Sequence, residues 1–183
     1  MGRMRIVIKK GFTLIELLIV IAIIGVLAVS LLPSILSGPA SARNVVRLND
    51  IRKIQTGLEA YKMQYGVYPP NTDNDDGAGG WDLGYSGGAG ASDTFIDPLR
   101  TLGIMSSVPK DPNGTGASNA YYYYLYPASY ASCPASRGDF YVLGIKDFET
   151  LSGVHPSSPG FSCPGRDWGL EFPQGYVTGD YTY

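Results

Sequence analysis

Histidine and cysteine, which often carry nucleophilic or metal chemistry, are scarce in this chain of 183 residues. The one histidine is His155, and the two cysteines are Cys133 and Cys163. A Ser-His-Asp triad would have to use His155, and no nucleophile-elbow motif identifies a serine partner. A zinc site built from these three residues would lack an obvious fourth protein ligand. The composition therefore gives no support to catalysis of this kind, and we expect no enzyme.

Basic residues are scarce beyond the first third of the chain. From Val67 to the C-terminus, five lysines and arginines stand against thirteen acids, which gives this part a net charge of about −8. Such a region should repel the phosphates of nucleic acids, and the tyrosines at 121–124 lack the basic groove that single-strand binding requires. We therefore expect no nucleic-acid partner. Cations crowd the first ten residues instead, at Arg3, Arg5, Lys9 and Lys10.

One apolar segment, residues 12–36, dominates the N-terminal part. Its interruptions are Thr13, Glu16, Ser30, Pro33 and Ser34. At about 1.5 Å per residue, a helix of this length crosses the roughly 30 Å of hydrocarbon in a bilayer. The preceding cations should stay in the cytoplasm, so the chain after this segment should be exported. The small residues at 38–42 would suit signal-peptide cleavage, but the apolar segment exceeds the usual length of about 7–15 residues.

Residues 37–66 predict an amphipathic continuation of this helix that packs on the exported domain. Apolar side chains recur at spacings of three and four and form one stripe. The stripe consists of Val45, Leu48, Ile51, Ile54, Leu58, Tyr61 and Tyr65. The basic residues should lie mostly off it, at Arg43, Arg47, Arg52, Lys53 and Lys62. Gly66 should end the helix near Tyr65, whereas Gly38 and Pro39 should kink or locally unwind it.

Residues 67–183 predict a small exported α+β domain. The segments 119–127 and 139–148 are rich in Tyr, Phe and Val, which favours strands of an antiparallel sheet. A short helix or turn is expected within 95–112. Tyrosines that alternate along a strand should form one buried and one exposed row. Cys133 and Cys163 are an even pair in an exported chain, which predicts a disulfide closing a loop of about thirty residues.

A polar, glycine-rich loop should precede the first strand. Its acids offer a candidate calcium site because Asn71, Asp73 and Asp75 have the alternate spacing of oxygen ligands, and Asp82 follows where an EF-hand has its closing ligand. The glycine that such a loop requires is displaced to Gly77, and the closing ligand is not a glutamate. A solvated acidic loop is the simpler interpretation, and no other cofactor is expected.

The stretch Lys10-Gly11-Phe12-Thr13-Leu14-Ile15-Glu16, between a short basic leader and a long apolar helix, resembles the prepilin processing site of type IV pilins and type II secretion pseudopilins. Gly25 and Pro33 stand where such helices commonly carry these residues. The stretches "LEAYKMQYGVYP" and "VPKDP" resemble the helix end and a later loop of the major, G-type pseudopilin. The resemblance covers residues 1–70 well and 100–145 loosely, and the last forty residues depart from it.

This resemblance implies a pilin-like protein with a leader at 1–11 and a transmembrane and assembly helix at 12–36. A prepilin peptidase would cut after Gly11 and the new amino terminus of Phe12 would be methylated. Glu16, a carboxylate that is costly in lipid, would then pair with the Phe12 amine of its own or an adjoining subunit. Further implied partners are the chain itself, the bilayer before assembly, and an inner-membrane assembly platform with its motor.

Two questions stay open at this level. Type IV pilins commonly close a C-terminal region with a disulfide and G-type pseudopilins generally do not, so the cysteines favour a pilin while the helix end favours a pseudopilin. Some G-type pseudopilins bind calcium in a C-terminal loop, which "IKDFETLSGVHPSSPG" does not clearly reproduce. The sequence thus predicts a structural subunit of an extracellular or periplasmic filament. The alternative is a membrane-anchored exported binding module or enzyme that forms no filament.

Overall fold

A computed structural model describes residues 11–72, 80–85, 94–116 and 119–183, and within 30–37 it describes the backbone only. The chain divides into two compact units, Met1–Pro39 and Ala40–Tyr183. One helix, α1, runs from Leu14 to Tyr65 and so contributes to both units.

The first unit is the N-terminal part of α1. The large apolar side chains described here, from Phe12 to Val29, are all exposed. Among the residues that the structure describes, no helix is both long and apolar enough to cross a membrane. The side chains of residues 30–36, which complete the predicted span, lie outside that described set.

Of the two effects predicted for Gly38 and Pro39, a kink or local unwinding, the structure shows no unwinding. Helical backbone continues from Leu14 to Tyr65 without a break. A proline inside a helix removes one backbone hydrogen bond and crowds the carbonyl of the preceding turn, yet helical backbone continues through Pro39. The predicted end of the helix near Tyr65 is confirmed, since Gly66 has a φ of +77° that suits glycine and stops the helix.

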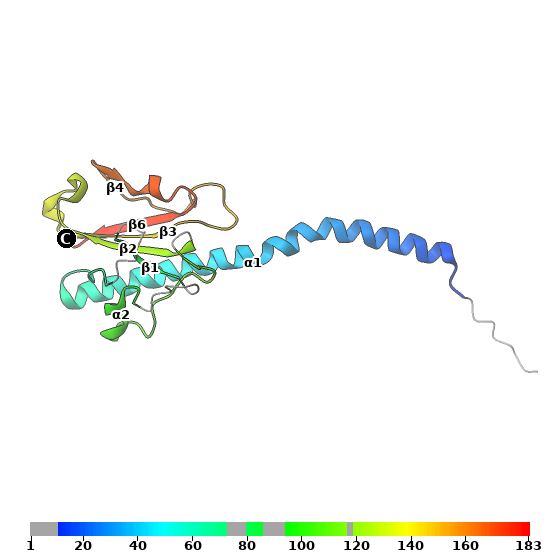
Figure 1. The fold of residues 1–183 in the computed structure, drawn as a ribbon, viewed down its shortest axis with the longest axis horizontal. Helices are drawn as coiled ribbons and strands as arrows, with labels where there is room; N and C mark the ends of the chain where they lie inside the picture. The colour runs from blue at the N-terminus through cyan, green and yellow to red at the C-terminus, as the bar shows by residue number, and fades with distance from the viewer. Residues whose placement is uncertain (1–10, 73–79, 86–93, 117–118) are drawn as a thin grey trace, which may run out of the picture. The chain divides into compact units, whose positions relative to one another are not determined.

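In the second unit, a four-stranded antiparallel sheet has the order β1-β2-β3-β6 (Figure 1). The register places Leu83 opposite Tyr122, and Tyr123 opposite Leu143. The strands are β1 (Asp82–Gly84), β2 (Tyr121–Tyr126), β3 (Phe140–Ile145) and β6 (Tyr176–Tyr181). The smaller elements are α2 (Asp97–Thr101), a two-stranded ribbon of β4 (Ser162–Cys163) and β5 (Arg166–Asp167), and the 3₁₀ turns η2 (Tyr130–Ser132), η3 (Ala135–Arg137) and η4 (Trp168–Glu171).

The predicted α+β class, both predicted strands and the short helix are therefore confirmed. The strand β6 was not anticipated because the C-terminal forty residues mix aromatic residues with glycine, proline and serine. It pairs with β3 along its full length, from Tyr181 opposite Phe140 to Tyr176 opposite Ile145.

Two apolar cores lie on opposite faces of the sheet. In Figure 1, α1 runs along one face and the segment that carries β4 covers the other. The first core joins Ile51, Ile54 and Leu58 of α1 to Tyr121 and Tyr123 of β2. Val45 and Tyr65, which the predicted stripe included, are exposed instead.

The second core corrects the prediction of an exposed row of tyrosines. Tyr122 and Tyr126 point away from α1, yet they are only 7% and 3% exposed. Trp168 and Phe172 from the C-terminal segment cover them, and the Trp168 indole N–H donates a hydrogen bond to the Tyr126 hydroxyl at 3.2 Å. A sheet covered on both faces buries both rows of side chains, so the alternating pattern alone cannot reveal an exposed face.

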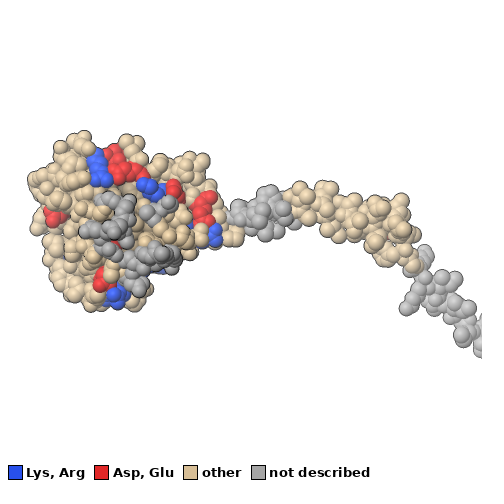
Figure 2. Space-filling model, viewed as in Figure 1, with Lys and Arg blue, Asp and Glu red and all other residues tan. Residues whose placement is uncertain are grey.

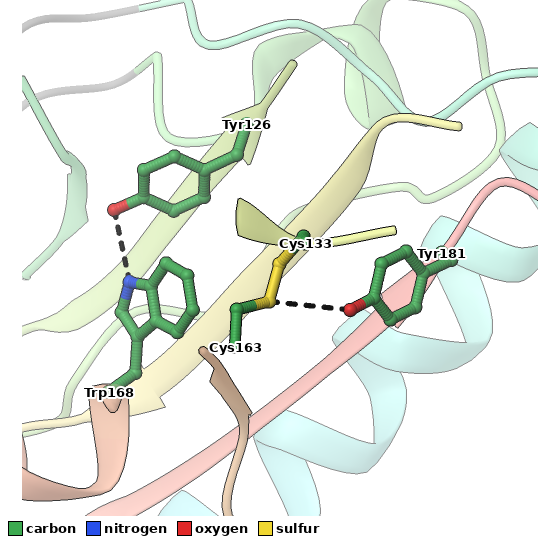
Figure 3. Close-up of a disulfide and its surroundings, with 5 residues drawn as sticks. All are labelled: Tyr126, Cys133, Cys163, Trp168 and Tyr181. Atoms are coloured by element: carbon green, nitrogen blue, oxygen red, sulfur yellow. Dashed lines mark hydrogen bonds between the residues drawn. A yellow bond between two sulfur atoms is a disulfide. The ribbon is translucent and has the colours of Figure 1, made fainter. Parts of the chain in front are cut away.

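The predicted disulfide between Cys133 and Cys163 is confirmed (Figure 3). The two Cα atoms lie 5.1 Å apart, which suits a disulfide. The hydroxyl of Tyr181 donates a hydrogen bond of 3.4 Å to the Cys163 sulfur. The bond joins the C-terminal segment to a turn in which Ser129, Ala131 and Ser132 have positive φ angles, a conformation that costs non-glycine residues energy.

We expect that replacing both cysteines by serine lowers the free energy of unfolding of the second unit by about 3–4 kcal/mol. A crosslink between residues thirty positions apart lowers the conformational entropy of the unfolded chain. On the loop-entropy account, this raises the free energy of the unfolded state by about 3–4 kcal/mol. Urea unfolding of the full chain in detergent, followed by tryptophan fluorescence, measures this because Trp168 is buried in the second core. An unchanged unfolding midpoint would show that the disulfide does not stabilise the domain.

Candidate assembly and processing site

The bond between Gly11 and Phe12 lies in an irregular stretch before α1. Phe12 is 85% exposed, and residues 11–13 have no regular secondary structure. A Cβ atom added to Gly11 would have no described atom within 4 Å. Nothing described in the chain itself therefore requires glycine at this position, so any such requirement would come from a molecule that approaches the bond.

Thr13 and Glu16 form a capping box at the start of α1. The Thr13 backbone N–H and its hydroxyl both donate hydrogen bonds to Glu16 Oε2, at 2.8 and 2.7 Å. The Glu16 backbone N–H donates in return to Thr13 Oγ1 at 3.3 Å. This reciprocal arrangement satisfies N–H groups that the first turn of a helix cannot pair internally.

The capping box was missed by the sequence interpretation, which treated Glu16 as an assembly residue alone. The signal was present, since Thr-x-x-Glu before an apolar run is a recognisable helix start. A carboxylate has about four acceptor positions on its two oxygens, so Glu16 can hold its cap and still accept an amine. The cap also places this carboxylate within one helical turn of the Phe12 backbone nitrogen.

A second set of charged residues ties α1 to two distant segments, and we call Arg43, Arg47, Asp111 and Glu149 the arginine clasp. Arg47 is 1% exposed. Its guanidinium donates to both oxygens of Asp111, from Nε to Oδ2 at 2.7 Å and from Nη2 to Oδ1 at 3.0 Å. Asp111 belongs to the "VPKDP" stretch, so a buried bidentate ion pair anchors this loop to the helix.

Glu149 completes the clasp from the segment after β3. It accepts hydrogen bonds from two nitrogens of Arg43, with Nε at 2.8 Å from Oε1, and Arg47 Nη1 lies 2.8 Å from the same oxygen. Hydrogen bonds from Arg43, with those from Arg47, hold the pKa of Glu149 at about 2. Asn44 adds a hydrogen bond from its amide nitrogen to the Thr150 hydroxyl at 2.6 Å.

The prediction that the arginines lie mostly off the buried stripe is wrong for Arg47. Counting back from Leu58 by steps of three and four gives Ile54, Ile51, Arg47 and Asn44, so the buried face continues through polar residues. The spacing of three and four residues therefore places Arg47 on the buried face of the helix. It could not reveal that the partner of this cation is an acid 64 residues away.

The described calcium candidates hold structural hydrogen bonds. Asn71 Oδ1 accepts from the Leu125 backbone N–H at 2.8 Å. Asp82 is fully buried, and its Oδ2 accepts from the Thr72 hydroxyl at 3.1 Å and from the Ile96 backbone N–H at 3.0 Å. The other two candidates, Asp73 and Asp75, lie outside the described residues. Within the described part of the chain, no group of three His, Cys, Asp or Glu residues could hold a metal ion.

The histidine alternatives receive no support from the geometry. Cys133 and Cys163 are joined to each other, so their sulfurs are not thiolates that could ligate zinc beside His155. His155 Nδ1 lies 2.7 Å from the Ser157 hydroxyl in an exposed turn, and its ring packs beside Phe148. This is a local turn contact between residues two positions apart.

Comparison with known proteins relates the chain to filament subunits. Residues 8–32 match the family model described as the prokaryotic N-terminal methylation motif. A type II secretion system core protein G from Vibrio cholerae is 30% identical over 148 residues, which cover 80% of this chain and 87% of that protein.

Two further relatives match over shorter lengths. Core protein G from Pseudomonas aeruginosa is 39% identical over 61 residues, covering 33% of this chain and 43% of that protein. The type IV wide pilus major component PilA4 from Thermus thermophilus is 48% identical over 65 residues, covering 34% of this chain and 47% of that protein. The chain thus spans less than half the length of these two relatives. No solved structure matches it significantly.

Proposed function

Since the chain belongs to the family of type II secretion system core protein G, we propose that it is a structural subunit of a filament of the type II secretion pseudopilus or type IV pilus class. The observation that carries this proposal is the extent of the Vibrio cholerae match, which reaches over 80% of the chain. A shared membrane anchor alone would explain a match to residues 8–32 but not one of that length. The anchored enzyme or binding module is therefore not favoured.

Processing at Gly11 is the first step of the proposed pathway. A prepilin peptidase cuts between Gly11 and Phe12, and the new amino terminus of Phe12 is methylated. The exposed, irregular backbone at this bond supports the proposal, as does the absence of any described neighbour that would require glycine. Lys9 and Lys10 lie just before the bond and would hold the leader at anionic headgroups on the cytoplasmic side.

Before assembly, residues 12–36 span the cytoplasmic membrane and the second unit is exported. Exposed leucine, isoleucine and valine side chains from Leu14 to Val29 support this step, because lipid or other copies must cover such a surface in water. Assembly then moves the subunit into an extracellular or periplasmic filament. An inner-membrane platform and motor act as partners in this transfer.

Glu16 acts during assembly. Its carboxylate pairs with the methylated amine of Phe12 on an adjoining copy, while the hydrogen bonds from Thr13 hold it at the tip of α1. Burying a charge in a low-dielectric filament core costs free energy because the charge loses its water. The attraction between the acid and the amine offsets this cost when they pair, whereas either charge buried alone is left uncompensated. The pair would therefore favour the filament over the isolated subunit in lipid.

We expect Gly11→Val to abolish processing and filament formation while leaving the folded domain unchanged. No described atom lies within 4 Å of a Cβ added at Gly11, so the block would arise in the peptidase. Immunoblotting of membranes should show only the longer precursor. Gly25→Ala is the matched control, because Gly25 also has no described neighbour within 4 Å of an added Cβ and lies inside the helix. Normal cleavage of Gly11→Val would contradict the proposed processing site.

A further inference from the structure

The outward face of the C-terminal part of α1 carries cations and no acids, although other cations of this part are turned toward the domain. Both acids of this part are turned toward the domain, where Asp50 Oδ2 accepts from the Tyr121 hydroxyl at 3.1 Å and Glu59 Oε1 accepts from the Tyr68 hydroxyl at 2.7 Å. Arg52 and Lys53 face outward, and 63% of the Lys53 side chain is exposed. The outward face of the helix therefore carries cations.

These two cations are only lightly engaged within their own chain. Lys53 lies 3.1 Å from Asp50 Oδ1 across one helical turn, and its exposed ammonium keeps further donors for another carboxylate. Arg52 makes a long contact of 3.5 Å with the Asn49 side-chain oxygen. Exposed pairs of this kind contribute little to folding.

A shallow groove lies beside Lys53. It has a volume of about 320 Å³ and is lined by small residues of α1 and by two apolar side chains from the segment after α2. Gly57 allows this close approach, since a Cβ at that position would lie 2.6 Å from the Met105 sulfur. The lining residues are Lys53, Thr56, Gly57, Ala60, Ile104 and Met105. The groove therefore offers apolar contact with a cation at its rim.

The rest of the second unit has the opposite net charge, and internal ion pairs neutralise only part of it. The described basic residues after Val67 include several that bind groups of their own domain. Arg100 pairs with Asp97 at 2.6 Å and Arg166 with Glu171 at 2.6 Å. Arg137 and Lys146 lie over aromatic rings. Thirteen acids against five bases leave the domain with a net negative charge, and Figure 2 shows acidic groups at several places on one of its faces.

From this separation of charge we propose that the outward face of α1, with Arg52, Lys53 and the groove, binds the acidic surface of a second copy of the chain. The inference rests on the proposed filament function and names a contact beyond the one made by Glu16. A cationic face cannot pair with itself, so the contact joins two different surfaces. Contacts of that kind extend into an open helical polymer when the rotation does not close a ring, rather than into a closed symmetric dimer.

Mixed filaments test the contact directly. Subunits labelled with ¹⁴N and ¹⁵N are co-assembled and treated with a carbodiimide, which joins an amine and a carboxylate that already touch. We expect peptides that link Lys53 of one isotope to an acid after Val67 of the other. Links from Lys53 only to Asp50 of the same isotope, in intact filaments, would overturn the proposal while leaving the filament function standing.

Charge variants provide a second test of the proposed contact. Arg52→Gln/Lys53→Gln should lower filament yield about three- to tenfold with normal cleavage, as expected for the loss of two exposed ion pairs per contact. Ser152→Glu/Leu170→Glu changes the net charge equally at exposed positions of the domain and should not lower the yield. Equal losses in both variants would mean a bulk charge effect and would refute the contact. Absence of filaments from the unaltered chain would instead refute the proposed function itself.

Discussion

Subunits with Glu16→Ala should be cleaved after Gly11 and inserted in the membrane but should yield few filaments. The substitution leaves the Phe12 amine of an adjoining copy without its carboxylate, and removing one partner of a fully buried ion pair costs about 3–5 kcal/mol. Even half of that cost would lower the equilibrium constant for adding one subunit to the filament by about tenfold or more. Quantifying sheared filaments against total mature subunit measures the effect.

The capping box makes a sharper design necessary, because Glu16→Ala removes a helix cap as well as a charge. Glu16→Gln removes the charge, and glutamine can still serve in a capping box. Thr13→Val removes the hydroxyl that both donates to and accepts from Glu16, and it keeps the charge. Loss of a cap costs about 1 kcal/mol.

The account predicts that Glu16→Gln is nearly as defective as Glu16→Ala and that Thr13→Val is much milder. The reverse order would identify Glu16 as a helix cap rather than an assembly contact. Wild-type filament yield from mature Glu16→Ala subunits would also remove its proposed role. Each variant should be compared at equal levels of cleaved protein.

Arg47→Met should destabilise the second unit by about 3–5 kcal/mol. The substitution keeps a long apolar stem but leaves buried Asp111 without the guanidinium that binds both of its oxygens. It also removes one of two arginines that pair with Glu149. Urea unfolding of the full chain in detergent gives the change in free energy.

A double substitution separates a lost charge pair from a general packing defect. Arg47→Met/Asp111→Leu removes both partners, which is far less costly than leaving one buried charge alone. We expect it to recover more than half of the stability lost in Arg47→Met. A single variant within about 0.5 kcal/mol of the wild type, the range for ordinary surface changes, would show that the clasp does not hold the loops to α1.

Features that depend on near neighbours were predictable from the sequence. The helix end followed from Gly66, the strands around Tyr123 and Val142 from runs of aromatic and β-branched residues, and the disulfide from an even cysteine pair in a chain expected to be exported. The first two signals reflect backbone preferences within the segment itself, and the third needed no choice of partner because the chain has only two cysteines. The similarity of residues 8–32 to the prokaryotic N-terminal methylation motif is equally local.

Features that depend on distant partners were not predictable. Arg47 is buried because Asp111 and Glu149 reach it from other segments, and nothing in the helix pattern identifies them. Tyr122 is buried because Phe172 covers it, in a part of the chain whose fold the sequence did not suggest. A helix stripe and an alternating strand state which face is apolar, and they do not state what covers the opposite face.

The intact mass of the main protein in purified filaments shows whether this chain is a processed filament subunit. We expect a chain that begins at N-methylated Phe12, retains the disulfide between Cys133 and Cys163, and forms the body of the filament. A chain that keeps Met1, or a mature chain found only as a membrane-bound monomer under conditions that produce filaments, would contradict this expectation.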